Sequence, residues 1–487
     1  MPRGLPGRDR GARFASFTSA RDTAMTTPAQ APMTEALADF VASFRPESLP
    51  EAVRETTRRL VTDGTAALVS AGNPAFSTGR IISEFVRDQG GEAVCSVVGQ
   101  GFRTSVVQAV LANGTMGYAS DVEPHHPEGI LHPVAVMIPV ALALCEAEGR
   151  SGRDMIAAVA LGLEVEYRLS VALGPSEQYA LGFHPSAVCG AFGAAAAASF
   201  LLGLDRARVV RAFGLAACQA SGLMAWESDP TENARPFQMG MAARNGVTAA
   251  MLAGRGFGGP TEVFDHGHTV FHAFSRSPAP EKLVADLGTA WDGVMEMAIK
   301  PYSCVAFLHP ALDALFDIVA ETDLRPAQVE RIVMRFPRDG IHCIDDNPLK
   351  SHCAQYVLPV ALTNRRLRIA DIFFDRREED AELRDLCGRV SVTSDPELDP
   401  LFPDFYATKL EITTRDGQVH SRRMDIARGY PEAPMTPEEL SAKFGDLAGA
   451  VLPAAEVAGL EAAAQGLWEA PDVSDYAARV GARFETQ

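Results

Sequence analysis

The feature that most constrains the fold is the stretch GAFGAAAAASFLL at residues 190–202. Alanine is the strongest helix former, and a helix with such small side chains can approach its neighbours closely. The stretch therefore predicts a central buried helix with other helices packed around it.

Helical periodicity extends over most of the first 285 residues. Apolar side chains recur at spacings of three and four, and prolines at 46 and 50 end the first run. Further helices are predicted at residues 52–70, 105–118, 133–148, 151–173, 205–223 and 238–255. No convincing strand pattern precedes Ala285. We therefore expect a large all-helical domain over residues 31–288.

The periodicity changes near Pro301. Apolar residues alternate at Ile332, Met334 and Phe336, which is typical of a strand, and residues 407–427 predict a hairpin that turns at Asp416-Gly417. Together with intervening helical segments, they predict an α+β domain over residues 289–428. Residues 429–487 return to a helical pattern and are expected to pack on the first domain. The predicted fold class is mainly α, with a smaller α+β domain inserted into a large all-helical one.

The first thirty residues differ in composition from the rest. They are rich in arginine, glycine and proline and lack the apolar core of a secretory signal. We interpret residues 1–30 as a disordered or mis-started extension, with Met25 or Met33 as the alternative start.

The overall charge excludes several classes of partner. The chain has 44 basic and 62 acidic residues, a net charge of -18, which argues against nucleic acid or an anionic membrane as a partner. No apolar run reaches the roughly 18 residues that a membrane span needs. The eight cysteines are scattered without a CxxC pair. These features favour a cytoplasmic protein with reduced thiols.

Candidate site residues gather in segments where polar side chains stand in apolar surroundings. These segments are residues 121–132 (DVEPHHPEGILH), 182–186 (GFHPS), 231–246 (TENARPFQMGMAARNG), 265–268 (DHGH) and 300–309 (KPYSCVAFLH). Among them, His132 and His184 precede long apolar helices, where an imidazole can transfer a proton or meet an anion. Arg235 stands just before a predicted helix start and suits a carboxylate, which helix amides also favour.

Several familiar sites are missing from the sequence. There is no HExxH, and the adjacent His125 and His126 cannot easily face one metal ion, so we predict no metal site. There is also no GxSxG and no P-loop, and GRGFGG at residues 254–259 lacks the context of a dinucleotide site. We therefore predict no cofactor.

These segments resemble the MmgE/PrpD family from about Met33 onward. The resemblance rests on Asp121 with His132-Pro133, GFHPSAVCGAFGAAAAAS, ARPFQMGMAARNG, KPYSC, AQYVLPVAL and YPEAPMTPEELSAKF. It implies a helical domain with an α+β lid, a homodimer, and cofactor-free chemistry on di- or tricarboxylates. It also implies a substrate pocket between the domains, lined by Asp121, His132, His184, Arg235, His266 or His268, and Tyr302.

The chain departs from the family pattern at two of these positions. The family commonly has lysine where this chain has Arg235, and histidine where it has Gln238. Arginine essentially cannot release a proton, so Arg235 is expected to bind a carboxylate. Gln238 is expected to bind substrate as well. Proton transfer is then left to His132, His184 or Tyr302.

The sequence therefore predicts an enzyme that removes a proton next to a carboxylate of a small polycarboxylate. A hydro-lyase resembling 2-methylcitrate dehydratase is the first choice. The alternatives are an epimerase or isomerase of a dicarboxylate, as in iminodisuccinate epimerisation, a cis-aconitate type of decarboxylase, and a family member that binds a carboxylate without catalysis.

Overall fold

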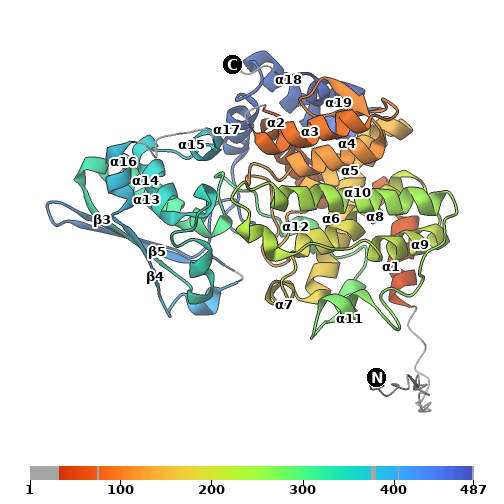
Figure 1. Ribbon diagram of the computed structural model, residues 1–487, viewed down its shortest axis with the longest axis horizontal. Coiled ribbons are helices and arrows are strands. Elements are labelled where there is room, and N and C mark those ends of the chain that lie inside the picture. The colour runs from red at the N-terminus through yellow and green to blue at the C-terminus, as the bar shows by residue number, and fades with distance from the viewer. Residues whose placement is uncertain (1–31, 74–75, 374–379, 404, 485–487) are drawn as a thin grey trace, which may run out of the picture. The chain divides into compact units, whose positions relative to one another are not determined.

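The computed structural model describes residues 32–73, 76–373, 380–403 and 405–484, and helices dominate its first 300 residues (Figure 1). These helices are α1 (Met33–Ser43), α2 (Glu51–Ala71), α3 (Ser77–Gln89), α4 (Val106–Met116), α5 (Val134–Glu148), α6 (Gly152–Leu173), α7 (Pro175–Ala180), α8 (Pro185–Leu201), α9 (Arg206–Ala217), α10 (Ala234–Gly254), α11 (Val270–Phe274) and α12 (Asp292–Met295). The predicted extension at residues 1–30, with Met25, lies outside the described residues.

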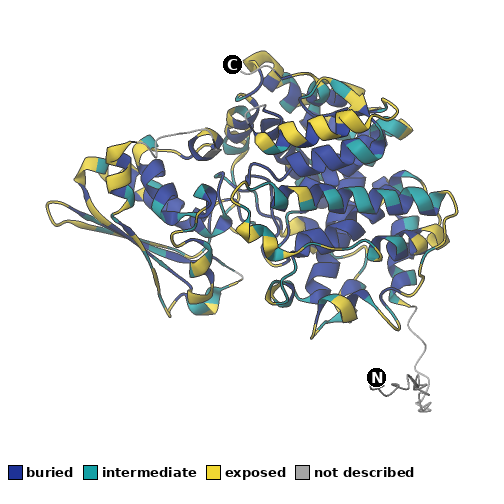
Figure 2. Ribbon diagram, viewed as in Figure 1, coloured by how far each residue is buried: buried dark blue, intermediate teal, exposed yellow. Residues whose placement is uncertain are grey.

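The alanine-rich helix α8 lies at the centre of this region, as predicted. Helices α5, α6, α9 and α10 pack against it, and Figure 2 shows it buried along its length. Glycines set the close approach of its neighbours: a Cβ at Gly246 of α10 would lie 2.4 Å from the Ala191 carbonyl, and one at Gly193 would lie 2.7 Å from the Gly162 carbonyl. Such distances admit no side chain. Small residues therefore hold α6 and α10 against α8.

One part of the helical region departs from the prediction. Strands β1 (Cys95–Val97) and β2 (Phe102–Thr104) form a short antiparallel hairpin between α3 and α4. Each strand has three residues, which is too short for the alternation that identifies a strand in sequence.

The later part of the chain carries a four-stranded mixed sheet in the order β4-β3-β5-β6. Its elements are β3 (Val329–Phe336), β4 (Val390–Ser394), β5 (Thr408–Thr414) and β6 (Val419–Met424), with helices α13 (His309–Thr322), α14 (Ala354–Asn364), α15 (Ile369–Phe373) and α16 (Ala381–Cys387). Strands β5 and β6 form the predicted hairpin, in which Gly417 has a φ of 86°. In Figure 1, α13 and α14 cover one face of the sheet, and alternate β5 residues are buried. The fold class, mainly α with a smaller α+β region, is confirmed.

Three helices follow the sheet: α17 (Pro437–Ala448), α18 (Ala454–Gln465) and α19 (Ser474–Gly481). Their buried residues Phe444, Leu460 and Tyr476 belong to the same hydrophobic core as the early helices. A second core is formed by residues from the sequence range 298–430. The exact domain boundaries proposed at residues 288 and 428 stay predictions.

No helix in the described part of the chain has the length and apolar character that crossing a bilayer requires. The eight cysteines are all free thiols.

Candidate active site

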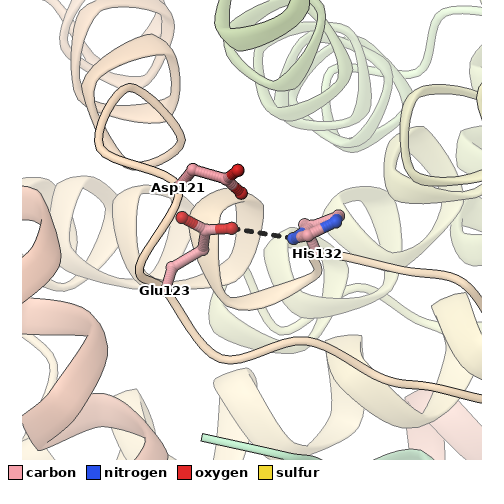
Figure 3. Close-up of side chains that lie close together, drawn as sticks. All are labelled: Asp121, Glu123 and His132. Carbon is pink, nitrogen blue, oxygen red and sulfur yellow. Dashed lines mark hydrogen bonds and ion pairs between the residues drawn. The ribbon is translucent and has the colours of Figure 1, made fainter. Parts of the chain in front are cut away.

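The loop between α4 and α5 brings three polar side chains together (Figure 3). Asp121 and Glu123 lie two residues apart, and His132 closes the loop just before α5. Asp121 has a left-handed backbone with a φ of 51°, which an aspartate tolerates better than most residues. The His132 amide donates to the Ser186 hydroxyl at 2.9 Å, which joins this loop to the start of α8.

Glu123 and His132 form a hydrogen-bonded pair. Glu123 Oε1 lies 2.7 Å from His132 Nδ1, and the Glu123 side chain is 1% exposed. Burial raises the pKa of Glu123 to about 7 and lowers that of His132 well below its usual range. When Glu123 is ionised it can only accept, so Nδ1 carries the proton. The Nε2 atom of His132, whose side chain is 16% exposed, is then a free base.

Lys300 is the cation of this cluster, and it was missing from the predicted site residues. Its buried ammonium lies 2.6 Å from Asp121 Oδ1, 3.3 Å from the Asp121 carbonyl and 3.5 Å from Glu123 Oε1. Asp121 and Glu123 raise the pKa of Lys300 against the opposing effect of burial, so the lysine stays charged. The sequence did contain a sign that Lys300 is buried, because the chain has few lysines and this one follows the apolar run MAI.

His184 lies at the N-cap of α8, and Gln238 of α10 holds it. Its Nδ1 is 3.0 Å from Gln238 Oε1, and the Gln238 amide nitrogen donates to the Leu223 carbonyl at 2.8 Å. The amide therefore presents its oxygen to His184, so Nδ1 carries the proton and Nε2 accepts. Burial lowers the pKa of His184 to about 3, which keeps the ring neutral.

Arg235 lies in the first turn of α10, not before it as the sequence suggested. The first amides of that region are already occupied, because Asp229 accepts from the amides of Asn233 and Ala234 at 3.0 and 2.8 Å. Two amides at the start of α10 thus bind the protein's own carboxylate instead of a ligand. The expected contribution of helix amides to substrate binding stays a prediction.

The Arg235 guanidinium is buried between two carboxylates. Its Nη1 lies 3.4 Å from Asp121 Oδ1 and its Nη2 lies 3.5 Å from Glu232 Oε2. The pKa of Arg235 is raised, with the opposite charges of Asp121 and Glu232 outweighing burial. Within the described chain, Nε and Nη2 have no hydrogen-bond partner. These two atoms form one edge of the planar fork that binds a carboxylate.

The Tyr118 ring connects these groups. Its centroid lies 4.4 Å from the His132 ring, 6.2 Å from the His184 ring and 4.6 Å from the Arg235 guanidinium carbon. Tyr118 follows the end of α4 in a segment without other aromatic residues, so nothing in the local pattern marked it as part of a site. The structure thus brings together Asp121, His132, His184, Arg235 and Gln238 from the predicted set.

Three predicted residues are not in contact with this cluster. His266 and His268 are exposed near α11, where the His268 ring lies 6.3 Å from that of His272. The Tyr302 hydroxyl donates to Asp313 Oδ1 at 2.7 Å, and burial raises its pKa further above the usual value. The structure therefore does not bring these three side chains to the cluster, and their expected place in the substrate pocket stays a prediction.

Asp121, Glu123 and His132 could in geometry hold a metal ion, since their ligand atoms lie within 4.8 Å of one another. Lys300 and Arg235 already balance these carboxylates at short range. A metal ion there would meet two fixed cations, which disfavours it by direct repulsion. The absence of a metal stays a prediction.

Comparison with known proteins places the chain in a family. Residues 35–283 match the model of the MmgE/PrpD N-terminal domain, and residues 302–467 match that of the C-terminal domain. The chain belongs to the MmgE/PrpD family. Family relatives include a cis-aconitate decarboxylase of Aspergillus terreus, 27% identical over 478 residues, which cover 92% of this chain and 95% of the relative. The cis-aconitate decarboxylase of Homo sapiens is 28% identical over 430 residues, covering 85% and 87% of the two chains. That of Mus musculus is 26% identical, with 85% and 86% covered.

Proposed function

We propose that this protein is a lyase that needs no cofactor and removes a proton next to a carboxylate of a small substrate. The observation that carries the proposal is the buried hydrogen bond from His132 to Glu123, together with the Arg235 guanidinium, whose Nε and Nη2 make no hydrogen bond in the described structure. A base and a carboxylate-binding group thus lie against the same Tyr118 ring. The relatives named above, which are decarboxylases, support a lyase in general.

In the proposed reaction, Arg235 Nε and Nη2 hold the substrate carboxylate. His132 Nε2 takes the proton from the adjacent carbon, and Glu123 stabilises the resulting imidazolium through Nδ1. The electron pair left by the proton moves onto the carboxylate, where Arg235 stabilises it. The C–O bond of a hydroxyl on the next carbon then breaks as His132 returns the proton to it. A carbon–carbon double bond forms, water leaves, and His132 is a free base again.

Hydro-lyase chemistry remains the first choice because the reaction steps described above need only one base. An epimerase would use the same abstraction, with a second group returning the proton to the other face. His184 could serve in that role, because Gln238 keeps its Nε2 available. An epimerase is thus the second candidate.

Decarboxylation is a further candidate, favoured by the printed names of the relatives. In that reaction the bond to a carboxylate breaks, carbon dioxide leaves and a proton is added to carbon. Arg235 cannot supply this proton, since its pKa is raised. A histidine would have to take a proton first. A protein that binds a carboxylate without catalysis has no need of the Glu123–His132 pair.

A proton NMR screen in deuterated water tests the proposal. The purified protein is incubated with citrate, methylcitrate, aconitate isomers, malates, tartrates and iminodisuccinate. A new alkene formed from a hydroxy acid without loss of carbon identifies a hydro-lyase and its substrate. A product that has lost carbon dioxide identifies a decarboxylase, and deuterium exchange without net product identifies an epimerase. No change with any compound, while binding is still measurable by thermal shift, overturns the proposal in favour of non-catalytic binding.

A further inference from the structure

The site has more carboxylates than cations, because Asp121, Glu123 and Glu232 surround Lys300 and Arg235. Lys300 and Arg235 lie within salt-bridge distance of Asp121, and Glu123 and Glu232 lie beside one cation each. Burial lowers the pKa of the neighbouring His132, His184 and His352, so these rings add no positive charge. The nearby Lys443 is paired with Asp63 at 2.7 Å. Among the described residues, the site offers no net positive charge to a polyanion.

The donors of the two cations are also unequally available. Lys300 has three acceptors from Asp121 and Glu123 for its three N–H groups. Arg235 uses Nη1 toward Asp121, and its Nε and Nη2 stay without a hydrogen bond in the described structure. The Nε and Nη2 atoms of Arg235 are therefore the charged donors that can bind a substrate. Two such donors on one edge suit a single carboxylate.

Glu232 lies directly beside that edge. Its Oε2 is 3.5 Å from Arg235 Nη2 and 3.5 Å from the Ser351 hydroxyl, which donates to it. Its backbone has a φ of 53°, and its side chain is 19% exposed. A substrate carboxylate bound to Nε and Nη2 would have the Glu232 carboxylate as its neighbour. A second substrate carboxylate on the same side would meet a fixed negative charge at short range.

We propose that Glu232 is a specificity residue that excludes a further carboxylate beside the one bound to Arg235, so that this protein binds dicarboxylates in preference to tricarboxylates. This inference rests on the proposed function, because it assumes that Arg235 binds the substrate. The relatives are named for cis-aconitate, which carries three carboxylates, so the inference predicts a different substrate for this chain.

The test compares two unreactive compounds of the same carbon backbone, glutarate and propane-1,2,3-tricarboxylate, by isothermal titration calorimetry. The wild-type protein is expected to bind glutarate at least about tenfold more tightly, because like charges at contact distance are costly in a buried site. Glu232→Gln removes the negative charge and keeps the side-chain shape, and it is expected to tighten tricarboxylate binding at least about tenfold while changing glutarate binding less. Glu227→Gln in the same loop is the matched control, because Glu227 is exposed and makes no ion pair with Arg235 in the described structure.

The outcomes separate the two proposals. Equal affinities in the wild type, or an unchanged ratio in Glu232→Gln, overturn the role of Glu232 and leave the carboxylate site intact. If neither compound binds, or if Arg235→Gln with an unchanged melting temperature still binds glutarate equally well, the carboxylate site itself is wrong. A change in ratio in Glu227→Gln as large as in Glu232→Gln also overturns the inference, because it would reflect net charge alone.

Discussion

The two histidines of the site are held in the same way but by different partners. In both His132 and His184 an acceptor fixes Nδ1 and leaves Nε2 free, yet the acceptor is the Glu123 carboxylate in one case and the Gln238 amide in the other. A carboxylate stabilises an imidazolium that forms during a reaction, whereas an amide only orients the ring. We therefore propose that His132 is the base and that His184 positions the substrate or assists.

The largest expected effect is therefore on the catalytic rate of the two histidine variants. His132→Ala is expected to lower kcat by roughly 10³- to 10⁴-fold, because the base and its stabilised cation are both lost. His184→Ala is expected to lose about 10- to 100-fold. Steady-state kinetics on the substrate found by NMR measures both, with the exposed His272→Ala as control. A larger loss for His184→Ala would reverse the assignment.

The loop that carries Asp121 and Glu123 is also held by Lys443, which is distant in sequence. Lys443 of α17 is buried, and its ammonium lies 2.7 Å from Asp63 of α2 and 2.9 Å from the carbonyl of Val122, between the two site carboxylates. Lys443→Met leaves Asp63 buried without its cation and is expected to destabilise the fold by about 3–5 kcal/mol. Urea unfolding measures this change.

A matched pair sharpens the interpretation of the Lys443 variant. Lys409 forms partly exposed ion pairs with Asp395 and Glu397 at the sheet, so Lys409→Met should cost far less stability than Lys443→Met. The double variant Asp63→Leu with Lys443→Met should recover much of the lost stability, because no unpaired charge remains. If Lys443→Met and Lys409→Met lose equal stability, the buried Lys443–Asp63 ion pair contributes no more than an exposed one.

The fold was largely predictable because its signals are local. Helix α8 has its composition in one contiguous stretch, and the β5–β6 hairpin has Asp416-Gly417 at its turn. The β1–β2 hairpin was missed because three residues are too few for a period.

The site was predictable only in part because its contacts are distant in sequence. Lys300 meets Asp121 across 179 residues, and no spacing rule records such a pairing. Asp229, which binds the amides at the start of α10, lies four residues before the N-cap Asn233, so the preference for aspartate at the N-cap does not identify it. His266 and Tyr302 were included for their residue types, which do not reveal that one is exposed and the other is bonded to Asp313.

The pH dependence of activity tests the pairing of the Glu123 carboxylate with His132. Below pH 7 Glu123 gains a proton, since its pKa is raised to about 7 by burial, and it then donates to His132 Nδ1. The proton of the ring moves to Nε2, which can no longer act as a base. The rate is therefore expected to rise as pH increases through about 7. Glu123→Gln should lose this rise and about 100-fold in kcat, because an amide does not titrate. A retained rise near pH 7 would assign it to another group.

The smallest effect concerns the amide side, where Gln238→Glu gives His184 the kind of partner that His132 has. The new carboxylate accepts from Nδ1 and favours the charged ring, so the pKa of His184, which burial lowers to about 3, is expected to increase by at least about one unit. The chemical shift of the His184 ring proton against pH measures the change, and Gln219→Glu, also on a partly buried glutamine, is the control for added charge. If the pKa of His184 does not move, the Nδ1 contact with residue 238 is too weak to set the state of the ring, and the contrast between the two histidines must arise from burial instead of from their partners.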